Sequence, residues 1–216
     1  MLLNLANWFT VGRIAVTPIV MLLPFSPSAA MRLGGFVLFL AAAISDYIDG
    51  HLARSRQQKT DLGAMLDPLA DKLLLVGTLV PMYLLADRFP FVTPFGDVGL
   101  HWSLVVVVLG RELFMTVFRQ MAARRGLVIA AIGPAKWKTG FQFVWQGASY
   151  FWFFAATLAE NQGWQGEAAW RAFALFNGTV AVVSMAGAVL LTLYSLWLYV
   201  QRYSYVFRKG EHGPSR

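Results

Sequence analysis

Four aspartates lie close together in the sequence, at the ends of long apolar segments. Asp46 and Asp49 are three residues apart, and Asp67 and Asp71 are four residues apart. Spacings of three and four place both members of a pair on one face of a helix. Carboxylates that crowd into one site repel one another unless a cation neutralises them. Oxygen ligands favour Mg²⁺, Mn²⁺ or Ca²⁺, and a pair of such ions suits phosphoryl chemistry.

Small residues and one arginine accompany the aspartates. Gly50 and Ala53 continue the helical face of Asp46 and Asp49, and small side chains there allow a ligand or another helix to approach closely. Arg54 carries a planar guanidinium group that suits a phosphate. The alternative is that the aspartates only cap helices or reach the membrane interface, and the joint spacing of all four disfavours it.

The elements that must position these residues are long apolar segments. Of the 216 residues, 57% are hydrophobic and only 13% are charged, which excludes a soluble enzyme, a fibrous protein and a disordered chain. The segments lack the strict alternation of a membrane barrel, so we expect helices, which satisfy their own backbone hydrogen bonds. The sequence predicts an all-α integral membrane protein, a single domain over residues 1–216. Its six transmembrane helices are expected at about 9–25, 33–52, 65–86, 102–121, 139–159 and 172–200.

The distribution of Lys and Arg predicts the orientation of these segments. Basic residues gather near one set of segment ends, and only Arg32, Arg88 and Arg171 lie near the other set. Because cytoplasmic loops are enriched in Lys and Arg, both termini and the aspartates are expected on the cytoplasmic side. The net charge of +7 then reflects topology and anionic lipids, and no nucleic-acid partner is expected. The sequence contains no cysteine, and its first residues do not resemble a cleavable signal peptide.

The aspartates, the small residues and the arginine fit one pattern over residues 46–71. The pattern reads D-x2-D-G-x2-A-R-x8-G-x3-D-x3-D, in which Gly63 is the second glycine. Every fixed position of this pattern matches the signature that it resembles, that of the CDP-alcohol phosphatidyltransferases. Asn7, Thr10 and Arg13 are similar to the N-x2-T-x2-R opening of the bacterial members of this family.

The resemblance implies a membrane enzyme that usually forms a homodimer and displaces CMP from a CDP-linked lipid by attack of an acceptor alcohol. It implies that Asp71 acts as the general base on the acceptor hydroxyl. It also implies a divalent metal, most often Mg²⁺ or else Mn²⁺, with two ions expected. The implied metal ligands are Asp46, Asp49, Asp67 and Asp71. The implied residues for the nucleotide and the CDP-lipid are Asn7, Thr10, Arg13, Asp46, Gly50, Ala53, Arg54 and Gly63.

A second basic group predicts where the acceptor binds. Arg111 and Arg119 lie on similar faces of one helix, and Lys136 and Lys138 begin the next. A water-soluble acceptor that carries a phosphate fits these cations. The segments around them resemble those of phosphatidylglycerophosphate synthases, which implies glycerol 3-phosphate as the acceptor. The alternative is that these cations only fix the topology, and Arg111 is expected to pair with Glu112.

Other functions stay open at the level of the sequence. Sister enzymes use other acceptors, such as phosphatidylglycerol, from which cardiolipin is made, or inositol phosphate. A divalent-cation transporter is the non-enzymatic alternative, although a transport path needs polar groups across the membrane, and here they gather at one face. The resemblance implies a bacterial inner (cytoplasmic) membrane with the active site facing the cytoplasm. A mitochondrial inner membrane is the alternative location.

Overall fold

The chain folds into long helices joined by short connections. The computed structural model describes residues 5–55, 61–127, 129 and 133–203, and only the backbone of residues 5–7, 46–55, 61–65, 134 and 136. The long helices are α1 Leu5–Leu22, α2 Ala29–Ser55, α3 Asp61–Leu84, α4 Trp102–Arg124, α5 Gly133–Gln162 and α6 Ala168–Tyr203. Each of them overlaps one predicted segment, so the prediction that these segments are helical is confirmed.

A short β-hairpin connects α3 to α4. Strand β1 (Phe91–Thr93) pairs antiparallel with β2 (Gly96–Val98), and the hydroxyl of Thr93 donates to the Gly96 carbonyl at 2.6 Å. Gly96 has a φ of +115°, which glycine adopts without steric cost. The expectation of an all-α chain misses this hairpin, because strands of three residues leave no detectable alternation. Two 3₁₀ turns, η1 (Leu23–Phe25) and η2 (Trp164–Gly166), complete the elements of the described residues.

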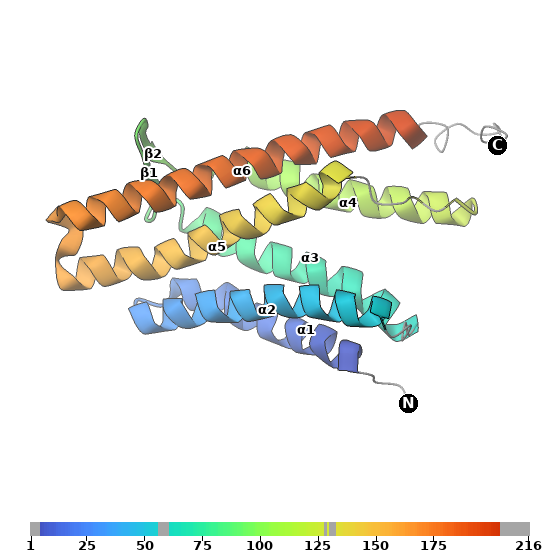
Figure 1. Cartoon of the computed structure of the whole chain (residues 1–216), viewed down its shortest axis with the longest axis horizontal. Helices are drawn as coiled ribbons and strands as arrows, with labels where there is room; N and C mark the ends of the chain where they lie inside the picture. Colours follow the sequence, from blue (N-terminus) through green and yellow to red (C-terminus); the bar gives the residue numbers. More distant parts are fainter. Residues whose placement is uncertain (1–4, 56–60, 128, 130–132, 204–216) are drawn as a thin grey trace.

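The helices run up and down, so α1 begins and α6 ends at the same end of the molecule (Figure 1). Helix α1 packs against both α2 and α3, while α5 packs against α2 and α6. We expect α2 and α3 to be direct neighbours, because only a short connection joins them. For the described residues this expectation is wrong: α2 and α3 make few direct contacts, since α1 packs against both of them.

Small residues and buried polar groups hold the helices together. Gly77 of α3 lies against Thr17 of α1, and Gly178 of α6 lies against the backbone of Val92 in β1. The hydroxyl of Tyr150 in α5 is within hydrogen-bond distance of the carbonyl oxygens of Val20 (3.2 Å) and Gly77 (3.3 Å). Close backbone approach at small residues and hydrogen bonds between helices are typical of bundles in membranes.

Two stretches among the described residues are long and apolar enough to cross a membrane, Trp8–Phe25 and Ala168–Tyr203. A shorter apolar stretch covers Ala29–Ser45. Helix α3 carries its charged residues in its first half, and α4 carries charged residues at several points along its length. The expected number of six membrane spans is therefore not confirmed.

Candidate active site

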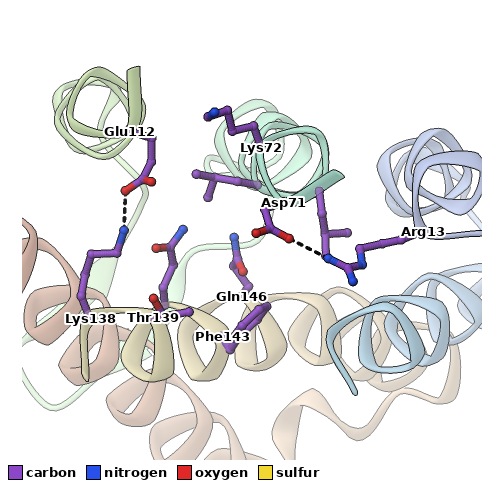
Figure 2. Close-up of a pocket in the computed structure, with 11 residues that line it drawn as sticks. Arg13, Asp71, Lys72, Glu112, Lys138, Thr139, Phe143 and Gln146 are labelled. Carbon is purple, nitrogen blue, oxygen red and sulfur yellow. Dashed lines mark hydrogen bonds and ion pairs between the residues drawn. The ribbon is translucent and has the colours of Figure 1, made fainter. Parts of the chain in front are cut away.

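A cavity of about 150 Å³, lined by both charged and apolar side chains, lies between α1, α3, α4 and α5. In Figure 2 the Arg13 side chain points toward Asp71, and the Lys138 side chain points toward Glu112. The lining residues are Arg13, Asp71, Lys72, Leu74, Leu75, Glu112, Lys138, Thr139, Gln142, Phe143 and Gln146. Three predicted site residues, Arg13, Asp71 and Lys138, thus meet in one cavity although they are distant in the sequence.

The wall formed by α3 carries the second pair of aspartates, and α1 contacts both of them. The hydroxyl of Thr10 donates to Asp67 at 2.7 Å, and the Arg13 guanidinium group donates to Asp71 at 2.6 Å. Thr10 and Arg13 are buried, whereas the Asp71 side chain is 56% exposed. Because residues three apart share a helix face, the N-terminal motif of α1 faces the aspartates of α3. One oxygen of an accessible carboxylate is thereby fixed by a buried cation.

Glu112 of α4 connects the cations of the expected acceptor site. The carboxylate accepts from Arg111 at 2.8 Å and from the Lys138 ammonium group of α5 through the same oxygen. Arg111 also donates to the Ser195 hydroxyl of α6 at 3.2 Å, so this cluster joins three helices. The predicted pairing of Arg111 with Glu112 is confirmed. Arg111 and Lys138 are buried, and burial strengthens such ion pairs because water screens them less.

Helix α5 presents a line of polar side chains along its inner face. Lys138, Gln142 and Gln146 follow one another at intervals of four residues, and all three are buried. The Gln146 amide donates to the Thr78 hydroxyl of α3 at 2.8 Å. This line runs from the Glu112 ion pair to the α3 side of the cavity, so α5 supplies most of the neutral polar groups of the site.

Several predicted site residues lie elsewhere or outside the described side chains. Arg119 is exposed and does not line the cavity. Asp46, Asp49, Gly50, Ala53 and Arg54 belong to α2, Gly63 to α3, Asn7 to α1 and Lys136 to α5, each described by its backbone alone. The convergence of all four aspartates therefore stays a prediction.

The carboxylates of α3 fit a hard divalent cation by their chemistry, because Mg²⁺ and Mn²⁺ bind oxygen ligands. Asp67 and Asp71 lie one helical turn apart on the same helix, and neither is buried. Among the side chains that the structure describes, no group of three or more His, Cys, Asp or Glu residues could hold a metal. A metal site at this place needs the aspartates of α2 as well.

Sequence reasoning does not assign three of the polar residues that line the cavity, Lys72, Gln142 and Gln146. The signal for the two glutamines is that they follow Lys138 at intervals of four residues, inside a largely apolar segment. Lys72 directly follows Asp71, and in the cytoplasmic part of a predicted span it resembles a lysine that reaches the membrane interface.

The fold and the cavity define a class of protein, a helical bundle with a charged site between its helices. The chain matches the family described as CDP-alcohol phosphatidyltransferase over residues 3–194. It belongs to the CDP-alcohol phosphatidyltransferase family.

Relatives of this chain carry related enzyme names. A probable phosphatidylglycerophosphate synthase of Mycobacterium tuberculosis is 36% identical over 144 residues, which cover 65% of this chain and 63% of that protein. A CMP-forming cardiolipin synthase of Oryza sativa is 37% identical over 150 residues, 65% of this chain and 44% of that protein. A CDP-diacylglycerol–glycerol-3-phosphate 3-phosphatidyltransferase of Bacillus subtilis is 33% identical over 153 residues, 65% of this chain and 73% of that protein. The match thus spans less than two thirds of the mycobacterial and rice relatives.

Proposed function

We propose that the protein transfers a phosphatidyl group from CDP-diacylglycerol to glycerol 3-phosphate. The acceptor hydroxyl oxygen forms a bond to the phosphorus that carries diacylglycerol. The bond from that phosphorus to the bridging oxygen breaks, and CMP leaves with this oxygen. The hydroxyl proton passes to the Asp71 carboxylate, and the product is phosphatidylglycerophosphate. Family membership and the names of the mycobacterial and Bacillus relatives support this proposal.

The observation that carries the proposal is a carboxylate and a lysine at one cavity. Asp71 enters it from α3 and Lys138 from α5 (Figure 2). A carboxylate within reach of the attacking hydroxyl acts as a general base, and an ammonium group attracts an acceptor phosphate. Arg13 holds one oxygen of Asp71, so the carboxylate keeps its orientation when a substrate enters.

Divalent metal dependence is part of the proposal. The residues that would hold two ions, Mg²⁺ or else Mn²⁺, are Asp46, Asp49, Asp67 and Asp71. When bound, such ions neutralise the diphosphate of the CDP-lipid and stabilise the leaving CMP. The oxygen-rich donor set of α3 supports this assignment, as does the pattern over residues 46–71.

We propose six membrane spans, with the cavity facing the cytoplasm of a bacterial inner membrane. Helices α2 to α6 each contain 23 or more residues, which at 1.5 Å per residue reach across a hydrocarbon core of about 30 Å. Large apolar side chains also stay exposed on several helices, among them Leu113, Phe176 and Leu190. Such surface is typical of contact with lipid. The enrichment of Lys and Arg at the end where α6 finishes supports the orientation.

We also propose that the protein forms a homodimer, as the resemblance to the family implies. Light scattering of the detergent-solubilised protein measures the mass of the protein component. A mass of two chains supports the dimer, and a mass of one chain at assay concentration contradicts it.

A second acceptor has support from one comparison. The rice relative is named a CMP-forming cardiolipin synthase, and such a name points to phosphatidylglycerol as the acceptor. The two acceptors share a glycerol group and a phosphate, so the same cavity suits both. The buried Lys138–Glu112–Arg111 cluster favours the smaller, soluble acceptor, because it can enter between helices more easily than a second lipid.

The test is CMP release by the purified protein in detergent with CDP-diacylglycerol, Mg²⁺ and one acceptor at a time. We expect release with glycerol 3-phosphate that stops when a chelator is added and resumes with excess Mg²⁺. CMP release with phosphatidylglycerol but not with glycerol 3-phosphate would show that phosphatidylglycerol is the acceptor. Folded protein that releases no CMP with any acceptor would overturn the proposed activity.

A further inference from the structure

The Gln142 side chain lines the cavity, and no hydrogen bond joins its amide to another described residue. Gln142 is 8% exposed. By contrast, Gln146, one turn further along α5, donates to Thr78 at 2.8 Å. The Gln142 amide is not among the fully buried unpaired groups of the described residues, so it stays open to the cavity. There it offers two donors and an acceptor. An amide at a cavity wall that no neighbour satisfies is available to a ligand that displaces water from the cavity.

The neighbours of Gln142 restrict what that ligand is. Lys138 lies one turn earlier on the same face of α5, about 6 Å along the helix axis, and Asp71 enters the cavity from α3. The lysine already serves an acceptor phosphate, so the neutral amide is left for a neutral polar group of the same ligand. In the proposed reaction the cation attracts the acceptor phosphate and Asp71 takes the proton of the attacking hydroxyl. A glycerol acceptor keeps one group that neither residue binds, the secondary hydroxyl between its phosphate and its reacting end.

We propose that Gln142 binds this non-reacting secondary hydroxyl and so makes the cavity selective for glycerol-type acceptors. The inference rests on the proposed function and adds a residue that determines specificity. The hydroxyl both donates and accepts, so it satisfies either end of the amide. When an acceptor fills the cavity and displaces its water, an acceptor without this hydroxyl leaves the amide without a partner. For this reason sites built around a hydroxyl strongly reject analogues that lack it.

The experiment compares two acceptors that differ only in this group. Glycerol 3-phosphate carries the secondary hydroxyl, and 3-hydroxypropyl phosphate has hydrogen in its place. For the unmodified protein we expect kcat/KM to be about 100-fold higher with glycerol 3-phosphate. In Gln142→Leu we expect the ratio to fall to about threefold or less, mainly because glycerol 3-phosphate is used less well.

Gln146→Leu is the matched control, because it makes the same change one turn further along α5. Its amide already has a partner in Thr78, so we expect lower thermal stability and an unchanged preference between the two acceptors. Thermal unfolding and gel filtration of every variant in detergent separate loss of folding from loss of selectivity.

Each outcome decides between the inference and its alternatives. Equal use of both acceptors by the unmodified protein would overturn the inference while leaving the proposed activity intact. An equal loss with both acceptors in Gln142→Leu would also overturn it, since the amide would then only hold water or the fold. If phosphatidylglycerol alone is the acceptor, the same comparison uses phosphatidylpropanediol, which lacks the hydroxyl. No CMP release from folded protein with any acceptor would overturn both proposals.

Discussion

Asp71 is the residue on which the proposed chemistry depends most. Its carboxylate lines the cavity, accepts from the buried Arg13 and stays accessible. Asp71→Asn keeps the size of the side chain but removes the basic oxygen. We expect kcat for CMP release to fall at least about 100-fold, the scale of general base catalysis.

The control for this change is Asp87→Asn, which makes the same substitution at an exposed aspartate outside the cavity. We expect it to retain its activity. Steady-state rates and thermal unfolding of both variants check the prediction. Near-normal turnover by Asp71→Asn would remove Asp71 from the proposed mechanism.

Glu112 holds two buried cations at one carboxylate oxygen. Glu112→Gln keeps the shape but removes the charge, which leaves Arg111 and Lys138 to repel each other. We expect the free energy of unfolding to fall by about 1–3 kcal/mol. We also expect glycerol 3-phosphate to raise the unfolding temperature more in this variant than in the unmodified protein, because its phosphate supplies the missing negative charge.

Thermal unfolding in detergent, with and without the acceptor, measures both effects. Glu167→Gln, at an exposed position after η2, is the control and should change neither value. If the acceptor stabilises Glu112→Gln no more than the unmodified protein, the phosphate does not bind beside Glu112.

At the scale of elements, the contact between α6 and the β-hairpin depends on a residue without a side chain. A Cβ atom on Gly178 would meet the backbone of Val92, and a backbone cannot move aside as a flexible side chain does. We expect Gly178→Ala to lower the free energy of unfolding by about 1–3 kcal/mol, as overpacking does. The chain offers Gly110 as the control, since nothing lies within 4 Å of a Cβ placed there.

Gly110→Ala should leave stability unchanged or raise it by about 1 kcal/mol, because alanine favours a helix more than glycine does. Thermal unfolding of the two variants under the same detergent conditions gives the comparison. Equal stability of Gly178→Ala and Gly110→Ala would show that α6 and the hairpin are not in close contact.

The positions of the helices could be predicted from the sequence, but not all of their contacts. Long apolar runs separated by Pro, Gly and charged residues predict all six long helices. The hairpin is too short to leave a pattern. The partner of each helix depends on how side chains fit in three dimensions, and for that reason the contact of α1 with both α2 and α3 was not predicted.

The site was predictable where a charged residue belongs to a motif. Asp71, Arg13 and Lys138 meet at the cavity as their motifs suggest. Of the two ion pairs of Glu112, the pair with Arg111 was predicted from the sequence. The pair with Lys138 was not predicted, because Lys138 belongs to another helix. Gln142 is a neutral residue in an apolar segment, and only the structure reveals that its amide lines the cavity without a partner among the described residues.

For the whole molecule, the proposed topology places the hairpin and the cavity on opposite sides of the membrane. The chain has no cysteine, so a thiol reagent can label the protein only at a cysteine that is introduced by mutation. Phe95→Cys marks the hairpin, where Phe95 is 100% exposed, and Ala123→Cys marks the exposed end of α4. In intact cells we expect a membrane-impermeant maleimide to label Phe95→Cys, and to label Ala123→Cys only after the membrane is opened. Labelling of both positions in intact cells, or the reverse pattern, would contradict a cytoplasmic site, because the reagent reaches only the outer face.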